Sequence, residues 1–149
     1  MIQDVLMEPL KILPASDGNV MHMLRADAPF FKEFGEIYFS WVNPGCLKGW
    51  KKHLRQTQHF VVPVGKIKLV LFDDRKDSKT NQQIQEIEMS PHDYHLVRVP
   101  KNIWYSFKAV SREPALIANC TDIPHDPKES IRLDISESMI PYSWNNPSL

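Results

Sequence analysis

Residues 45–65 read GCLKGWKKHLRQTQHFVVPVG and contain the most informative pattern in the chain. A glycine stands at each end, and two short segments with β character lie between them. Lys51 and His53 are two residues apart, so on a strand their side chains point to the same face. We therefore expect a strand over Cys46–His53 and a second over His59–Val64, interrupted by Pro63.

Short strand patterns continue on both sides of this stretch, separated by turn signals such as Asn43-Pro44-Gly45. They cover Val20–Arg25, Glu36–Val42, Lys66–Phe72, Ile84–Met89, Tyr94–Val99, Ile103–Val110 and Ala115–Asn119. Nine to eleven strands at this spacing predict an all-β sandwich or barrel with little helix. The polar run 73–83 is expected to form an exposed, mobile loop, and residues 128–138 a short helical or irregular segment.

The length of 149 residues predicts one domain, with a core over about residues 15–122 and an irregular C-terminal segment over 123–149. Twelve prolines against five glycines favour stiff loops and strands over a helical bundle. The 18 basic and 18 acidic side chains cancel, which argues against a nucleic-acid partner.

Membrane insertion and secretion are not expected either. No apolar run approaches the roughly 20 residues that span a bilayer, and the N-terminal residues carry acids without a basic segment. Cys46 and Cys120 do not form a metal-type pair and are expected to be buried free thiols. The sequence thus predicts a cytoplasmic protein with no membrane partner.

The spacing between Gly45 and Gly65 resembles the first cupin motif, G-x5-H-x-H-x4-E-x6-G. Lys51 stands at the first histidine of that motif, His53 at the second and Gln58 at the glutamate. Residues 100–105 resemble the second cupin motif and place Tyr105 at its histidine. The resemblance implies a cupin jelly roll, also called a double-stranded β-helix.

These four positions do not suit a transition metal. An ammonium group is not a ligand at neutral pH, and a neutral amide is a poor one. One imidazole among four positions predicts a cavity without a metal or other cofactor, which excludes a dioxygenase. A metal-binding cupin remains the weakest of the readings.

Longer stretches resemble the dTDP-4-dehydrorhamnose 3,5-epimerase superfamily and the related dTDP-sugar 3,4-ketoisomerases. They are NPGCLKGWKKH (43–53), the strand from Gly65 to Arg75, RVPKNIWYSF (98–107), ANCTD (118–122) and PYSW (141–144). The similarity covers about residues 15–144. It implies a homodimer that takes a nucleotide-sugar substrate.

This sequence has different residues at the positions that are catalytic in these families. Lys51 stands at the position of the epimerase histidine, and residues 119–124 (NCTDIP) replace the segment with its catalytic tyrosine. Only the second histidine of the ketoisomerase pair is present, as His53. Lys48 replaces a binding arginine, which keeps the charge but loses the two-pronged hydrogen bonding of a guanidinium.

Four residues are our catalytic candidates. His53 suits a base that removes a proton next to a ketone. Lys51 is a second base or a diphosphate ligand, and Tyr105 a proton donor to an enolate oxygen. Asp73 could orient His53 or bind a sugar hydroxyl. Each also has an unreactive alternative: a barrel histidine, a solvated lysine, a lining aromatic ring and a strand-end charge.

Substrate-binding roles are predicted for a second set, in which the aromatic members could equally be core residues. It comprises Lys48, Gln58, Lys68, Tyr38, Trp104 and Arg75.

The resemblance implies an epimerase or keto-isomerase that acts on a 4-keto-6-deoxy sugar nucleotide in surface polysaccharide biosynthesis, by proton abstraction and reprotonation without a metal. The departures at Lys51 and residues 119–124 leave a second hypothesis open. It is a non-catalytic cupin that binds a nucleotide sugar.

Overall fold

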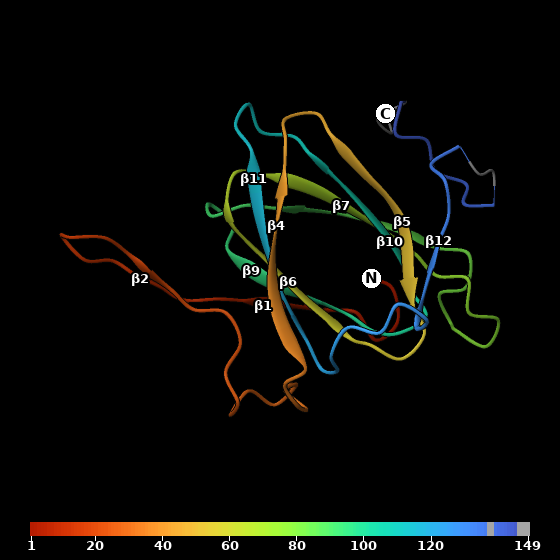
Figure 1. Ribbon diagram of the computed structural model, residues 1–149, viewed down its shortest axis with the longest axis horizontal. Helices are drawn as coiled ribbons and strands as arrows, with labels where there is room; N and C mark the ends of the chain where they lie inside the picture. Colours follow the sequence, from red (N-terminus) through yellow and green to blue (C-terminus); the bar gives the residue numbers. More distant parts are fainter. Residues whose placement is uncertain (137–138, 146–149) are drawn as a thin grey trace.

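The computed structural model describes residues 1–136 and 139–145, and shows two antiparallel sheets packed face to face. The first sheet has the order β1 (Leu6–Pro9), β9 (His95–Val99), β6 (Gln58–Val64), β11 (Ala115–Thr121) and β4 (Glu36–Val42). The second has the order β12 (Ser130–Arg132), β5 (Leu47–His53), β10 (Trp104–Ala109), β7 (Ile67–Phe72) and β8 (Ile84–Met89). A small hairpin of β2 (Ile12–Leu13) and β3 (Val20–Met21) projects from the body of the molecule (Figure 1).

The main core lies between the two sheets and is built from alternate residues of each strand. Leu69 and Leu71 of β7 meet Phe60 and Val62 of β6 there, all of them buried. Burying one such side chain completely stabilises the fold by about 1.5–3 kcal/mol relative to leaving it exposed to water.

A second cluster covers the outer face of the second sheet. Val70 and Phe72 of β7 point to that face and pack with Trp50 and Trp104, and Ile140 of the C-terminal segment lies on top. β7 is therefore buried on both faces, which explains its continuous apolar run.

The all-β jelly roll is confirmed, and the structure has no helix among the residues it describes. Two predicted strands, Glu36–Val42 and Ile84–Met89, have the observed bounds. Across the same part of the chain, nothing helical is long and apolar enough to cross a membrane.

Other predictions about the elements were wrong. The described residues form twelve strands rather than nine to eleven. Val20–Arg25 gives only the two-residue β3 because it pairs with the equally short β2 rather than with a sheet. Residues 130–132 form β12 where a helical or irregular segment was expected, because the edge of β5 offers them backbone partners; residues 137–138 lie outside the described ranges.

Pro63 does not interrupt β6, which runs from Gln58 to Val64. The pairing of β6 with β11 shifts register between Leu116 and Ala118, so the strand is bulged close to the proline. A bulge accommodates a residue that has no N–H to donate to the ladder.

The backbone conformation requires glycine at both ends of the 45–65 stretch. Gly45 has φ of 70° and Gly65 has φ of 73°, in the left-handed region that glycine enters without a steric cost. A side chain at Gly65 would also place its Cβ 2.7 Å from the Cα of Ala115. These two turns therefore set the ends of β5 and β6.

The cysteine prediction holds for one residue only. Cys120 is a buried free thiol on β11, whereas Cys46 is exposed, because it lies in the turn before β5 rather than within the strand.

Candidate active site

A cavity of about 420 Å³ opens between the sheets. Its apolar floor is formed by Phe60, Phe107 and Ile117, and polar side chains from β4, β5, β10, β11 and β12 surround it. These polar residues are Tyr38, Ser40, Lys48, Lys51, Tyr105, Asn119 and Arg132. A volume of this size is typical of small-molecule sites.

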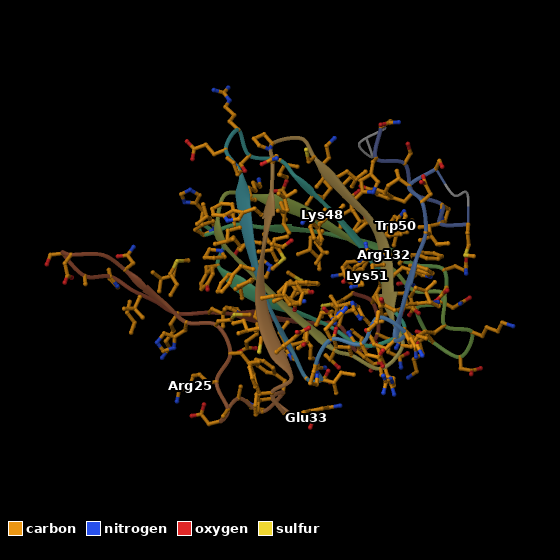
Figure 2. The ribbon with its side chains drawn as sticks, viewed as in Figure 1. Arg25, Glu33, Lys48, Trp50, Lys51 and Arg132 are labelled. Carbon is orange, nitrogen blue, oxygen red and sulfur yellow. The ribbon has the colours of Figure 1, made fainter. Side chains whose placement is uncertain are left out.

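Three cations line one side of the cavity and come from adjacent strands: Lys48, Lys51 and Arg132 (Figure 2). Arg132 of β12 lies directly opposite Lys51 of β5. Lys48 and Lys51 are three residues apart, yet both reach the cavity. The register of β5 on β10 shifts between Tyr105 and Phe107, so that β5 carries one extra residue there. Without this bulge, simple alternation would turn Lys48 outward.

The environment of Lys51 disfavours its positive charge. Burial lowers the pKa of the ammonium group, and the positive charge of Arg132 lowers it further, against the opposing influence of Glu129 and Glu36. Two cations held this close favour an anionic ligand between them.

Tyr105, His53 and Glu129 form a buried hydrogen-bonded chain behind the cavity. Glu129 accepts a hydrogen bond from Nδ1 of His53, and Nε2 of His53 lies 3.1 Å from the Tyr105 hydroxyl. The two rings are stacked with their centroids 5.9 Å apart. Because Nδ1 carries the proton toward Glu129, Nε2 of the neutral imidazole is free to accept the phenol proton.

The charge states in this chain follow from burial and from the hydrogen bonds. Burial lowers the pKa of His53 despite its bond to Glu129, and burial raises the pKa of Tyr105 well above its ordinary value. Burial would raise the pKa of Glu129, but the hydrogen bonds from His53, Arg55 and Gln56 outweigh it, so the carboxyl pKa is lowered. Near neutral pH, Glu129 is therefore an ionised carboxylate, His53 a neutral imidazole and Tyr105 a protonated phenol.

A second polar network supports the opposite wall. The side-chain amide of Asn119 donates to the Tyr38 hydroxyl at 2.7 Å and to the side-chain oxygen of Gln58 at 2.6 Å. Because Tyr38 accepts this bond, its own O–H remains available to a ligand in the cavity. Gln58 is buried and donates to Gln56 at 2.8 Å, so it supports Asn119 and does not line the cavity.

The structure thus brings together four of the ten predicted site residues at the cavity wall: Lys48, Lys51, Tyr105 and Tyr38. His53 stands one layer behind Tyr105.

Asp73 and Arg75 lie outside the cavity. Asp73 accepts hydrogen bonds from Arg75, Ser78 and Thr80, so the prediction that it orients His53 was wrong. The carboxylate of Glu129 bonds to His53 instead. Glu129 lies beside His53 because it immediately precedes β12, which pairs with the edge of β5.

Lys68 and Trp104 also lie outside the cavity. Lys68 points to the outer face of its sheet and pairs with Glu86 at 3.0 Å. Trp104 belongs to the outer cluster, and its indole N–H donates to Asp74 at 2.8 Å. Strand alternation explains both cases, since each is one residue away from an inward-facing neighbour.

Glu129, Arg132 and Asn119 were not among the predicted site residues. The first two come from a segment that gave no strand signal, and only the pairing of β12 with β5 reveals their place. Asn119 could have been found, because it lies in the segment 119–124 that stands where the related epimerases have a tyrosine.

The described part of the chain contains no group of three or more His, Cys, Asp and Glu side chains arranged to hold a metal ion.

Known proteins resemble this chain over nearly its whole length. The family model for dTDP-4-dehydrorhamnose 3,5-epimerase matches residues 19–149. A dTDP sugar isomerase from Desulfovibrio desulfuricans is 45% identical, with a TM-score of 0.96 over 99% of this chain and 95% of that one.

Two curated relatives are connected with glycans. A probable low-salt glycan biosynthesis epimerase of Haloferax volcanii is 32% identical over 95% of this chain and 88% of its own length. A spore coat polysaccharide biosynthesis protein of Bacillus subtilis is 26% identical, over 91% of this chain and 92% of its own length. By sequence and fold, this chain belongs to the dTDP-4-dehydrorhamnose 3,5-epimerase family of isomerases.

Proposed function

We propose that this protein epimerises or keto-isomerises a 4-keto-6-deoxy sugar nucleotide, in the cytoplasm, for surface polysaccharide biosynthesis. The observation that carries the proposal is the pairing of Lys51 with Tyr105 directly across β5 and β10, both in one cavity. The glycan-related relatives support the pathway class. The formal net charge of zero gives no reason to add nucleic acid as a partner.

The three cations account for nucleotide binding. A sugar nucleotide carries a diphosphate, and Lys48, Lys51 and Arg132 face the cavity from β5 and β12. Ammonium and guanidinium groups make the strongest hydrogen bonds to phosphate oxygens. Phe60 and Phe107 offer apolar surface for the sugar or base on the floor of the same cavity.

Tyr105, His53 and Glu129 are proposed to accept the proton. The Tyr105 oxygen takes the proton from the carbon next to the ketone, while its own phenol proton moves to Nε2 of His53. The Glu129 carboxylate stabilises the resulting imidazolium, as an acid does in hydrolytic triads. The electron pair of the broken C–H bond forms the enolate.

Lys51 completes the cycle from the other wall. Its ammonium group faces the developing negative charge and supplies the proton that returns to carbon. Return to the opposite face of the same carbon gives an epimer. Return at a different carbon after enediol formation gives a shifted ketone. Solvent then restores the proton of Lys51 and removes that of His53, so no metal or redox cofactor takes part in the scheme.

Deuterium incorporation tests this proposal. Incubation of the protein with dTDP-4-keto-6-deoxyglucose in heavy water is expected to place deuterium at C3 or C5, as seen by NMR or mass spectrometry. A Lys51→Met variant should lose about 10²–10⁴-fold in exchange rate, the usual effect of removing a general acid or base. Lack of exchange with any nucleotide 4-keto-sugar would remove the catalytic claim.

A non-catalytic nucleotide-sugar binder is the second candidate. One observation favours it: among the described residues that line the cavity there is neither a histidine nor a carboxylate. Calorimetry separates the two proposals, because tight binding of dTDP-sugar without deuterium exchange supports the binder.

A further inference from the structure

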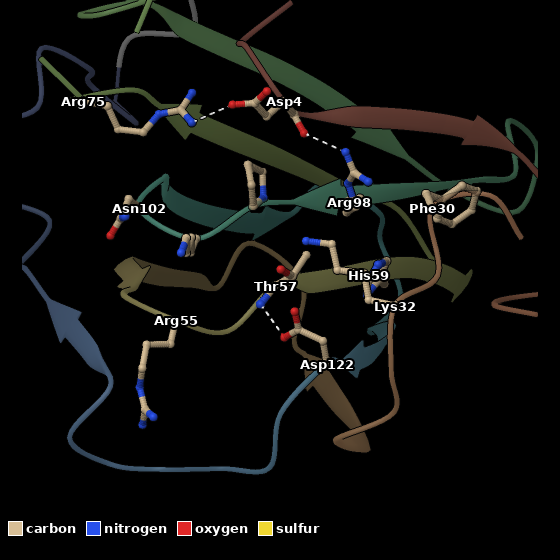
Figure 3. A pocket seen from close by; sticks show the side chains of 12 residues that line it. Asp4, Phe30, Lys32, Arg55, Thr57, His59, Arg75, Arg98, Asn102 and Asp122 are labelled. Atoms are coloured by element: carbon tan, nitrogen blue, oxygen red, sulfur yellow. Dashed lines mark hydrogen bonds and ion pairs between the residues drawn. The ribbon is translucent and has the colours of Figure 1, made fainter. Parts of the chain in front are cut away.

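A second cavity, of about 510 Å³, lies on the outer face of the first sheet (Figure 3). It shares no lining residue with the cavity between the sheets. Phe60 of β6 lines the inner cavity, and its neighbour on the same strand, His59, lines the outer one together with Thr57, which precedes the strand. Successive residues of a strand face opposite sides, so β6 separates the two spaces.

The lining of this outer cavity is strongly cationic. Five basic side chains, from Lys32, Arg55, Arg75, Arg98 and Lys101, meet two carboxylates, from Asp4 and Asp122. Arg75 is already paired with Asp73 and Asp4, and Arg55 with Asp126. Within residues 1–136 and 139–145, the other three basic side chains make no ion pair.

These three side chains, of which Arg98 also donates to the backbone carbonyl of Asp4 at 3.2 Å, come from separate parts of the chain. Lys32 lies in the link before β4, Arg98 on β9 and Lys101 in the turn that follows β9. Convergence of three positive groups on one cavity suits a phosphate, which offers three oxygens to separate donors, better than a carboxylate.

His59 adds a polar acceptor to the same wall. Its side chain is 3% exposed, and its Nδ1 donates to the carbonyl of Cys120 at 2.9 Å. Nε2 of the neutral ring is therefore an acceptor, and it is buried with no hydrogen-bond partner among the described residues. Buried polar groups normally have a partner, so this nitrogen calls for a donor from outside the chain.

Burial keeps His59 in this acceptor state. It lowers the pKa of the imidazole, and the positive charge of Arg98 lowers it further, against the hydrogen bond to Cys120 and the charge of Asp122. Arg98 lies directly opposite His59 on β9, and Asp122 lines the same cavity with one oxygen held by the Thr57 N–H at 2.7 Å. The ring of Phe30 stacks over His59 with the centroids 6.4 Å apart. The wall thus offers cations, an aromatic surface and a neutral acceptor in His59, beside the carboxylates of Asp4 and Asp122.

We propose that the outer cavity is a second ligand site, which binds a small hydroxylated phosphate monoester such as a sugar phosphate. The phosphate contacts Lys32, Arg98 and Lys101, and a sugar hydroxyl donates to Nε2 of His59. The site is separate from the proposed catalytic cavity and does not depend on the chemistry there.

NMR of the full-length protein with labelled histidine rings tests the proposal. Glucose 1-phosphate is expected to shift the His59 ring nitrogens, whereas glucose alone is not. The Lys51→Met variant, altered only in the inner cavity, should give the same shift. The Lys32→Ala/Lys101→Ala variant should bind about 100-fold more weakly, or about tenfold for each lost charge-assisted contact.

A His59→Phe variant tests the hydroxyl contact, since it keeps an aromatic ring on the wall. It should weaken glucose 1-phosphate and leave inorganic phosphate unchanged. The proposal is overturned if about 10 mM glucose 1-phosphate, enough to detect a millimolar dissociation constant, leaves the His59 signals unmoved. It is overturned equally if the Lys51→Met variant abolishes the shift. A dispersed amide spectrum confirms that each variant is folded.

Discussion

Lys51 and Arg132 place two positive charges at one wall of the inner cavity, and this pairing predicts a pH profile. In the proposed cycle His53 must be neutral and Lys51 charged. The rate should therefore rise as His53 loses its proton, at a pH below its ordinary pKa of about 6.5. It should fall again as Lys51 loses its proton, below its ordinary value of about 10.4.

The Arg132→Gln variant tests the upper limb of that profile. Removing a neighbouring positive charge raises the pKa of Lys51, so the descending limb of kcat should move to higher pH. The matched control is Arg112→Gln, an exposed arginine away from the cavity, which should leave the profile in place. An upper limb that rises with pH would show instead that Lys51 acts as the free amine.

Glu129 is proposed as a positioning residue, because it touches His53 and not the cavity. Glu129→Gln keeps the size of the side chain but removes the charge that stabilises the imidazolium. We expect kcat to fall by about 10²-fold, within the usual contribution of a positioned acid–base group, and KM to stay unchanged. A change in KM alone would assign Glu129 a purely structural role.

Individual site residues could be predicted only in part. The spacing between Gly45 and Gly65 identified Lys51 because strand alternation and motif register agree there. Lys48 reaches the cavity because β5 is bulged, and the simple alternation of side chains along a strand does not predict this. The place of Arg132 depends on its pairing with Lys51, more than 80 positions away, for which a single sequence carries no signal.

Residues 73–83 were expected to form an exposed, mobile loop; most of the loop is exposed, and part-buried hydrogen bonds to Asp73 anchor it. The Asp73 side chain is fully buried and accepts bonds from Arg75, Ser78 and Thr80. Burial opposes its ionisation, yet these donors hold the pKa of the carboxyl well below its usual range. Asp73→Ala should therefore destabilise the fold by about 1–3 kcal/mol, because it leaves the hydroxyl donors of Ser78 and Thr80 without their acceptor and leaves Arg75 with Asp4 as its remaining ion-pair partner.

Urea denaturation measures this loss, and Asp77→Ala, an exposed carboxylate of the same loop, is the matched control. The folded-state pKa of Asp73 lies below the unfolded value of about 3.9. Its contribution is thus complete above about pH 4 and shrinks as the pH falls through the folded-state pKa. Equal stability of the two variants at pH 7 would contradict the anchoring role.

The C-terminal segment connects the outer cluster to the inner cavity. Ile140 packs with Trp50 and Trp104 at the far end of the segment that supplies Arg132. Ile140→Ala should lower stability by about 2–5 kcal/mol and also weaken dTDP binding, although Ile140 touches no ligand. Calorimetry should show that Ile140→Ala weakens dTDP binding no more than Arg132→Gln does, because Ile140 acts on the ligand only through the position of Arg132.

Strands and turns were predictable where local signals were strong, as in Ile84–Met89 with its strict alternation. The predictions were wrong where pairing with another strand determines whether a segment becomes a strand. β12 forms because β5 leaves an edge free, and β3 is short because only β2 pairs with it.

The homodimer implied by the family resemblance remains a proposal, and β4 is its best location. β4 is an edge strand whose outward side chains Ile37, Phe39 and Trp41 are exposed by 48%, 62% and 58%. Exposed apolar rows on a free strand edge favour association. A Phe39→Asp/Trp41→Asp variant should sediment as a monomer while the native chain sediments as a dimer, and Val110→Asp, also exposed, should stay dimeric.

The origin of Glu129 and Arg132 in β12 and the residues just before it has a consequence for biosynthesis. A ribosome completes β1 to β11 before it reaches the codons of these two residues. A product that stops before residue 129 would therefore contain the strands around the main core but neither Glu129 nor Arg132. Such a product would also lack Ile140 and the rest of the cover over the outer cluster, so it would be both less stable and inert.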